Sequence, residues 1–277
     1  TPSTTNEQPL RIVFISLVNQ ERSRTRGESL GISQLKAYLE QEFGKEVAVE
    51  LIDLQIEPNV DQVLARLAQD PPAMIGLSAK VMTQNIVLET LGKRKQYPAF
   101  SERGTLFVVG NIAGAYAHQR ILEENHDVLV ALGEGELTCR DIVQHLKDLR
   151  PVTEINNIAY WDAERQQVAK TREYDVIQLS DIPAPDRENG QWMINNDGEV
   201  YLELSRGCGW GLCKFCAIFG FQNKRWRMKP VDVAIAEFEQ LARMGAKKVF
   251  LTDNDFLGPN PRTMDDLKVF QEFAQKK

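Results

Sequence analysis

Strand-like apolar runs alternate with amphipathic stretches over the first part of the chain. The five apolar runs lie at residues 10 to 17, 47 to 53, 74 to 79, 105 to 110 and 127 to 133. Between the first two runs, apolar side chains recur at helical spacing, namely at Ile32, Leu35, Leu39 and Phe43. Near-continuous apolar strands separated by helices are typical of a parallel sheet covered on both faces. The pattern therefore predicts an α/β fold with a doubly wound, five-strand parallel sheet.

The segments that follow these strands are rich in small and polar residues. In doubly wound sheets, ligands bind in the crevice outside the carboxyl ends of the strands. No G-x-G-x-x-G pattern follows the first strand, which disfavours a nicotinamide cofactor. The stretch from Gly133 to Glu136 has two interpretations. It is either a strand-to-helix turn whose acidic residues favour the helix N-terminus, or a cofactor contact where glycines let the backbone approach a ligand.

The pattern changes after residue 150. Two short apolar stretches, 156 to 162 and 167 to 171, flank a polar turn and predict a small hairpin. A stretch with two prolines follows at residues 179 to 190, and proline restricts the path of the chain. We therefore expect a sheet domain at residues 8–150, a linker at 151–194 and the start of a second domain at 195–277.

Composition narrows the class of protein. The 277 residues are 43% hydrophobic, enough for two ordinary cores, and the formal net charge of -6 disfavours nucleic acid as the main partner. The sequence has neither a run of 18 apolar residues nor the features of a signal peptide, so no membrane partner is expected. We expect a cytoplasmic, reducing setting, where clustered cysteines bind metals or act in catalysis rather than form disulfides.

Three cysteines lie close together after a strand-like run at residues 200 to 204. They are Cys208, Cys213 and Cys216, with four and two residues between them. A closed zinc site usually requires four nitrogen or sulfur ligands, and a fourth would have to come from elsewhere in the chain. A [4Fe-4S] cluster also normally takes four thiolates, so three cysteines would leave one iron open to another ligand. Both kinds of metal site remain possible on spacing alone.

The remaining candidates have ordinary alternatives. Cys139 falls on the apolar stripe of a predicted helix, which indicates core packing, and the three scattered histidines are not expected to bind metal. Residues 205 to 229 contain six basic residues and no acidic one, which is either a solvated face or positive charge beside an anionic metal cluster; the six are Arg206, Lys214, Lys224, Arg225, Arg227 and Lys229. The acidic stretch at 253 to 255, after the predicted strand that begins at Lys247, is either a solvated turn or part of a site.

Several motifs, taken in order, resemble the cobalamin-dependent radical SAM enzymes. They are GESLGISQLKAYLEQEFG, IGLSA, VVGN and ALGEGELTCRDIV in the sheet region, and then the three cysteines followed by a helix and a strand. The commonest spacing in that superfamily is C-x3-C-x2-C, and this chain has one residue more in the first gap. The D-x-H-x-x-G element of other cobalamin domains is missing, which implies that no protein imidazole lies below the corrin.

The resemblance implies a Rossmann-like cobalamin domain followed by the first part of a radical SAM (βα) barrel. It implies that Cys208, Cys213 and Cys216 hold a [4Fe-4S] cluster, and that Phe215, Asp253 and Asp255 contact S-adenosylmethionine. The residues expected to contact cobalamin follow the sheet strands, and they are Ser78, Val81, Gly110, Asn111, Gly133, Glu134, Gly135 and Glu136. Because too few residues follow position 195 for a complete barrel, we expect a part of a longer enzyme.

The resemblance also implies an activity. We expect reductive cleavage of S-adenosylmethionine at the cluster, most commonly for methyl transfer to an unactivated carbon or phosphorus centre. Ring rearrangement and methylthiolation are further possibilities. A small-molecule or peptide substrate and an electron donor such as flavodoxin or ferredoxin would be the partners. The alternative is a cobalamin-binding carrier or sensor whose cysteines hold a structural metal.

Overall fold

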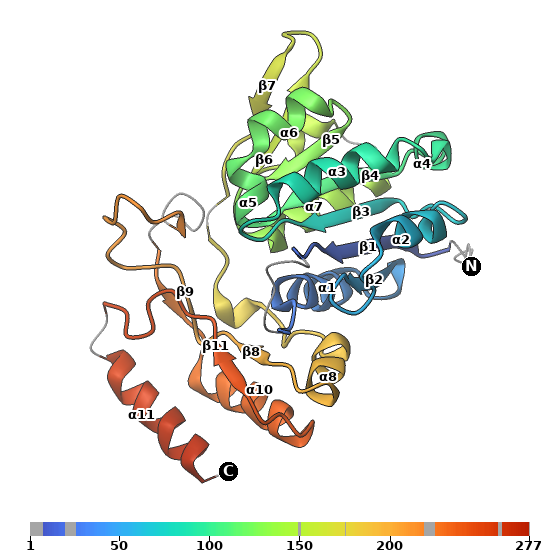
Figure 1. Ribbon diagram of the computed structural model, residues 1–277. Coiled ribbons are helices and arrows are strands. Elements are labelled where there is room, and N and C mark those ends of the chain that lie inside the picture. The colour runs from blue at the N-terminus through green and yellow to red at the C-terminus, as the bar shows by residue number, and fades with distance from the viewer. Residues whose placement is uncertain are drawn as a thin grey trace, which may run out of the picture.

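The computed structural model of the protein describes residues 8–19, 26–148, 151–174, 176–218, 225–259 and 262–276. A helix-covered sheet forms one part of the molecule, and a smaller part below it carries the C-terminus (Figure 1). None of the helices in the described ranges combines the length and apolar character that a membrane span requires.

The sheet has seven strands among the described residues, in the order β2-β1-β3-β4-β5-β6-β7. The first five run parallel: β1 (Leu10–Ser16), β2 (Val47–Asp53), β3 (Met74–Ser78), β4 (Leu106–Gly110) and β5 (Val128–Ala131). They coincide with the five apolar runs, so the predicted doubly wound parallel sheet is confirmed.

The predicted hairpin is also present, as β6 (Ile158–Asp162) and β7 (Gln167–Lys170). It does not stand apart as a linker element, because β6 pairs antiparallel with β5 and extends the sheet. The sequence predicts the hairpin from its local alternation. Its pairing with β5 is a long-range contact that no local pattern reveals.

Helices cover both faces of the sheet. The side chains of β1 alternate between two cores: Val13 and Ile15 face one, and Ile12 and Phe14 face the other. The helices of this domain are α1 (Leu30–Phe43), α2 (Val60–Leu67), α3 (Gln84–Arg94), α4 (Pro98–Arg103), α5 (Asn111–Tyr116), α6 (His118–Glu124) and α7 (Gly135–Asp148), with short 3-10 turns η1 (Gly44–Glu46) and η2 (Val152–Glu154).

Core packing explains the role of one predicted residue. Cys139 of α7 is buried against the same apolar core as Ile142 and Val143, as the helical stripe predicts. Burial raises the pKa of its thiol to about 12, so the thiol stays protonated at neutral pH. Cys139 is therefore a small apolar core residue.

The smaller part is built around a strand–helix–strand unit. The 3-10 turn η3 (Leu179–Asp181) and α8 (Glu188–Asn195) lead into β8 (Val200–Leu202), which pairs parallel with β11 (Val249–Leu251). Between them lie β9 (Ser205–Arg206), β10 (Arg227–Met228) and α10 (Val231–Arg243), and α11 (Arg262–Gln275) follows. A separate core holds this part together, including Val200, Leu241 and Phe270. The order of strand, cysteine loop, helix and strand is the one that the sequence predicts.

Candidate functional site

The cysteine loop begins directly after β9 and extends to the left in Figure 1. Its entry needs a glycine: Gly207 has a φ of +90°, and an added Cβ would lie 2.4 Å from the backbone oxygen of Arg225. Cys213 is exposed, Cys208 and Cys216 are half-buried, and all three are free thiols. None of the three is therefore buried in a core.

The thiols are not gathered into a metal-binding geometry. Within the described residues, no three His, Cys, Asp or Glu side chains lie close enough together to hold a metal ion. The donor set nevertheless fits an iron-sulfur cluster with one iron open, because three thiols share one loop and residues 205 to 229 contain no histidine or fourth cysteine. The backbone N–H of Cys216 donates to the carbonyl of Cys213 at 3.1 Å, so a tight turn holds this pair of residues near each other.

Two predicted carboxylates lie beside the start of this loop. Asp253, after β11, accepts hydrogen bonds from the Ser205 hydroxyl at 2.5 Å and from the Leu204 N–H at 3.4 Å. Asp255 accepts hydrogen bonds from the Gly209 and Gly258 N–H groups at 3.3 and 3.0 Å. The stretch is therefore not a solvated turn, since both side chains anchor the chain that carries Cys208.

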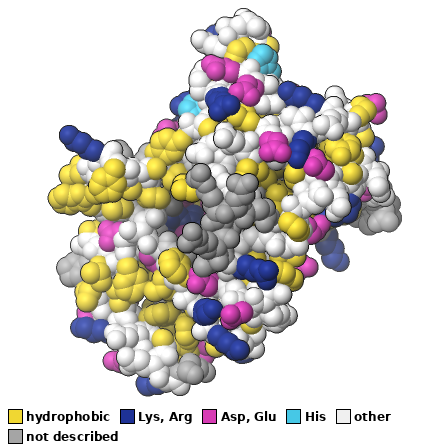
Figure 2. Space-filling model, viewed as in Figure 1, with side chains coloured by type: hydrophobic (Ala, Val, Ile, Leu, Met, Phe, Trp, Pro, Cys, Tyr) yellow, Lys and Arg dark blue, Asp and Glu magenta, His cyan; other side chains and the backbone are white. Residues whose placement is uncertain are grey.

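Hydrophobic side chains gather on the same loop. Trp210, Leu212 and Phe215 are 67%, 62% and 92% exposed. In Figure 2, hydrophobic side chains crowd the left of the molecule, over the loop seen there in Figure 1. The predicted contact of Phe215 with S-adenosylmethionine remains a prediction.

The candidate cobalamin residues lie at the carboxyl edge of the sheet. Strand register places Asp53, Ser16, Ser78 and Gly110 side by side at the ends of four strands. Asn111 adopts a φ of +69° and donates from its amide to the Ser78 hydroxyl at 3.2 Å. The edge is thus lined by small and polar groups.

The other predicted cobalamin contacts follow the strands β3 and β5. Val81 follows β3 and is 65% exposed, whereas Gly133 and Gly135 follow β5 at the start of α7. An added Cβ at Gly135 would lie 3.1 Å from the Leu35 side chain, so helix packing already accounts for that glycine. Contact of any of these residues with cobalamin remains a prediction.

The two acidic residues of this segment have protein partners instead. The Arg206 guanidinium donates to Glu134 at 3.2 Å, to Glu136 at 2.8 Å and to Glu203 at 2.9 Å, and Arg227 donates to Glu134 at 3.1 Å. Glu134 and Glu136 belong to the sheet domain, whereas the other three residues belong to the smaller part. We call these five residues the Arg206 network.

Burial makes the Arg206 network a strong constraint. The side chains of Arg206, Arg227, Glu134 and Glu136 are all at most 11% exposed. Although burial opposes it, the guanidinium of Arg206 lowers the pKa of Glu203, so that carboxyl stays ionised. A guanidinium with several carboxylates around it fixes position through charge-assisted hydrogen bonds. The glutamates therefore join the two parts of the protein.

A second buried network lies nearby and was not predicted. Arg187 of the linker donates to Glu28 at 2.6 Å and lies 3.7 Å from Glu237, which in turn accepts from Lys229 at 2.6 Å. All four side chains are at most 3% exposed. Glu28 precedes α1, so this Arg187 network joins the sheet domain, the linker and α10. The motif GESLG contained Glu28, but its partners lie far away in sequence.

The six basic residues of the stretch 205 to 229 therefore do not share one role. Arg206, Arg227 and Lys229 are buried and paired with carboxylates, so they are not a solvated face. Lys224 lies outside the described residues. The sequence could not separate these residues, because their acidic partners are distant along the chain.

One further contact brings the sheet edge and the cysteine loop together. The hydroxyl of Tyr116, at the end of α5, donates to the backbone carbonyl of Ala217 at 2.7 Å. Because α5 begins at the carboxyl end of β4, this hydrogen bond joins the ligand edge to the residue after Cys216. The carboxyl edge of the sheet and the cysteine loop are thus neighbours.

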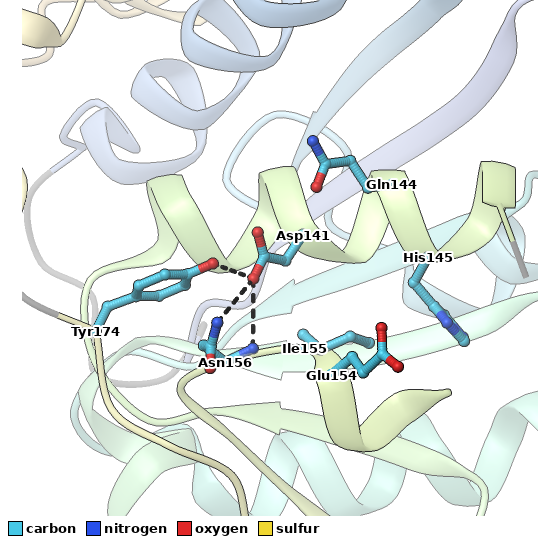
Figure 3. A pocket seen from close by; sticks show the side chains of 7 residues that line it. All are labelled: Asp141, Gln144, His145, Glu154, Ile155, Asn156 and Tyr174. Carbon is cyan, nitrogen blue, oxygen red and sulfur yellow. Dashed lines mark hydrogen bonds between the residues drawn. The ribbon is translucent and has the colours of Figure 1, made fainter. Parts of the chain in front are cut away.

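A pocket of about 210 Å3 lies on another side of α7 (Figure 3). Its lining contains none of the predicted site residues and consists of Asp141, Gln144, His145, Glu154, Ile155, Asn156 and Tyr174. Asp141 accepts hydrogen bonds from the Tyr174 hydroxyl and from the amide of Asn156, the latter at 3.4 Å. Because these polar groups bind each other, we assign the site chemistry to the sheet edge and the cysteine loop.

Comparison with known proteins shows what the sheet domain is similar to. A family model described as the B12 binding domain matches residues 18–143. The sheet domain is therefore similar to B12-binding domains. The match covers the carboxyl edge of the sheet from the end of β1 to α7, including every predicted cobalamin contact.

Solved structures share the fold of nearly the whole chain, beyond the part that matches the family model. A structure of the cobalamin-dependent S-adenosylmethionine radical enzyme OxsB, with aqua-cobalamin and S-adenosylmethionine bound, has a TM-score of 0.86 and 24% identity, and the match covers 98% of this chain and 37% of OxsB. The radical S-adenosylmethionine methyltransferase TsrM from Kitasatospora setae has a TM-score of 0.75 and 14% identity, covering 97% of this chain and 52% of TsrM. The chain has the fold of these enzymes.

A curated relative matches over a similar span. The 4'-phospho-dehydrooxetanocin synthase of Priestia megaterium is 26% identical over 249 residues, which is 87% of this chain and 32% of the relative. The chain therefore spans about a third of that protein.

Proposed function

We propose that the chain is part of a cobalamin-dependent radical SAM enzyme. This enzyme would cleave S-adenosylmethionine reductively, for methyl transfer to an unactivated centre. The observation that supports the proposal is the contact of the carboxyl edge of the sheet, in the part similar to B12-binding domains, with a loop of three free cysteines through Tyr116 and the Arg206 network. Two cofactors that must cooperate would then lie on facing surfaces.

The chain's own residues divide this work. Cys208, Cys213 and Cys216 would hold the cluster, and their free, accessible thiols suit that role. When bound, the cluster supplies an electron and cobalamin supplies a methyl carrier, so the difficult chemistry belongs to the cofactors. The protein orients them, and the small residues at the sheet edge leave room for a large ligand.

Asp253 and Asp255 would act next to the cluster. They already bind the segment from Ser205 to Gly209, so they position the first cysteine. A carboxylate oxygen can accept more than one hydrogen bond, which leaves capacity for the ammonium group of S-adenosylmethionine. Substrate and electron donor would be a small molecule or peptide and a protein such as flavodoxin or ferredoxin.

Anaerobic reconstitution of the purified chain tests the proposal. The chain is incubated with iron and sulfide, then titrated with hydroxocobalamin, and its metal content and visible absorbance are measured. Four iron atoms per chain, as expected for a [4Fe-4S] cluster, together with one bound cobalamin support the enzyme. One zinc ion without iron would instead support a carrier or sensor, and failure to bind cobalamin would contradict both.

A further inference from the structure

The carboxyl ends of β1 and β3 form the switch point of the sheet. The chain leaves β1 toward β2 on one side and then crosses to β3 on the other, so the strand order reverses there. Ligands of doubly wound sheets bind at this point. The residues at and around it are therefore the first candidates for ligand contact.

A chain of hydrogen bonds lies at this switch point. The Ser29 hydroxyl donates to the Asp53 carboxylate at the end of β2, and its oxygen lies 2.7 Å from the Ser16 hydroxyl oxygen at the end of β1. Lys80, two residues after β3, donates from Nζ to Ser29 Oγ at 2.9 Å. Lys80, Ser29 and Asp53 thus form a hydrogen-bonded chain across the ends of three adjacent strands.

The buried residues of this hydrogen-bonded chain are held in place by further contacts. Ser16, Ser29 and Asp53 are all buried. Asp53 also accepts from the backbone N–H of Gln55 at 2.9 Å, and the Gln55 side chain donates to the Gly27 carbonyl at 2.7 Å. These contacts hold the Ser29 segment in place, so the position of the Lys80 ammonium is defined.

Lys80 itself is only partly compensated. Within the described residues its ammonium forms no direct ion pair and reaches the Asp53 carboxylate only through the Ser29 hydroxyl. Burial lowers the pKa of Lys80, although Asp53 opposes that shift. The other nearby carboxylate on the Ser29 segment, Glu28, is already paired with Arg187.

The segment after Lys80 opens outward. Val81 and Met82 are 65% and 57% exposed, and Met82 has a φ of +70°, which is unusual for a residue other than glycine. An apolar surface that projects from this edge of the sheet, with the held Lys80 ammonium at its base, suits a large and flat ligand. The proposed cobalamin is such a ligand.

We propose that Lys80, held by Ser29 and Asp53, is the cationic contact of this edge with the corrin and favours the reduced cobalt. This inference rests on the proposed function. A positive charge stabilises the form of a bound group that carries less positive charge, and it does so more strongly in a partly buried site. The segments that follow β1, β2 and β3 contain no histidine, so Lys80 supplies the charged contact with the cofactor.

The test is the reduction potential of cobalamin bound to the full chain, measured by spectroelectrochemistry. Lys80→Met should shift the Co(II)/Co(I) potential to a more negative value, whereas Lys80→Arg should retain most of the wild-type potential because it keeps the charge. Ser29→Ala should give an intermediate shift, since it frees the ammonium without removing it. Lys95→Met is the matched control, because Lys95 lies just after the far end of α3 and is exposed.

The outcomes are distinct. Equal potentials for wild type and Lys80→Met, with cobalamin bound to both, would overturn the role of Lys80 while leaving the proposed function intact. Failure of the wild-type chain to bind hydroxocobalamin would overturn the proposed function and this inference with it. If Lys80→Met does not fold by circular dichroism, Lys80→Gln, which is polar and neutral, replaces it with the same expected direction.

Discussion

The sheet edge and the cysteine loop are neighbours, but they are prepared for their ligands to different degrees. At the sheet edge, Ser29, Asp53 and Lys80 are bound to one another and two of the three are buried. On the loop, the cysteines are exposed or half-buried and do not form a metal site among the described residues. Folding alone organises the first region, whereas the second would need the proposed cluster to bring its thiols together.

The largest expected effect breaks the loop. Changing Cys208, Cys213 or Cys216 singly to Ala should abolish iron uptake, because two thiolates cannot retain the cluster. Iron per chain after anaerobic reconstitution is the measurement. Cys139→Ala is the matched control and should retain full iron, since that thiol is buried in the core. A full iron complement in a triple Ala variant of the loop would refute the assignment.

The next prediction concerns the Arg206 network, which joins the sheet domain to the smaller part. Arg206→Met should lower the free energy of unfolding by about 3–5 kcal/mol, because Glu136 and Glu203 would be left buried without their cation and Glu134 would keep only Arg227. Urea unfolding measures this change.

An exposed arginine provides the comparison. Arg243 pairs with Glu239 on the surface of α10 and its side chain is 69% exposed, so Arg243→Met should cost about 0–1 kcal/mol. Equal losses for the two variants would show that the Arg206 network contributes no more than a surface ion pair.

A smaller effect concerns cofactor affinity beside the loop. An Asp253→Ala, Asp255→Ala double variant should keep its iron and bind S-adenosylmethionine roughly tenfold more weakly or worse, since a charge-assisted hydrogen bond is worth about 1.5–3 kcal/mol. Equilibrium dialysis with labelled S-adenosylmethionine gives the affinity. Because both residues bind the cysteine segment, iron content is measured first. Unchanged affinity with full iron would leave the two aspartates with a purely structural role.

The smallest effect is a pH dependence at the same place. Burial raises the pKa of Asp253 above 3.8, so this group favours the native state only while it is protonated. That contribution is present below the unfolded pKa and is lost as pH rises through the raised native pKa. The stability of wild type relative to Asp253→Asn should therefore fall as the pH rises from the ordinary Asp pKa through the raised native pKa. Urea unfolding across that range checks the sign, and a rising difference would contradict it.

The same contrast explains what the sequence could predict. The five parallel strands follow from continuous apolar runs, and Cys139 follows from a helical stripe, because both signals are local. The sequence predicts Glu134 and Glu136 as cobalamin contacts, and this stays a prediction; in the structure their side chains bind Arg206 and Arg227, about 70 to 93 residues away. Charge partners at such separations depend on how two parts of the fold meet, and no spacing rule records that.

Lys80 was missed for a related reason. It stands in IGLSAK between two residues that were selected, Ser78 and Val81, and a lysine after a strand usually indicates a solvated position. Its significance comes from Asp53 at the end of β2 and from Ser29 just before α1, which only the fold brings to it.

The Arg206 network also limits how such proteins can be recombined. If the sheet domain of this chain were joined to a different C-terminal part, it would bring Glu134 and Glu136 without the arginines that neutralise them, unless the new part carries cations at the same two places. Uncompensated carboxylates at a dry junction would drive the halves apart. A chimaera should therefore exchange the four residues Glu134, Glu136, Arg206 and Arg227 as one set. A chimaera that is joined between β7 and β8 and lacks the matching arginines should yield two folded parts that do not associate.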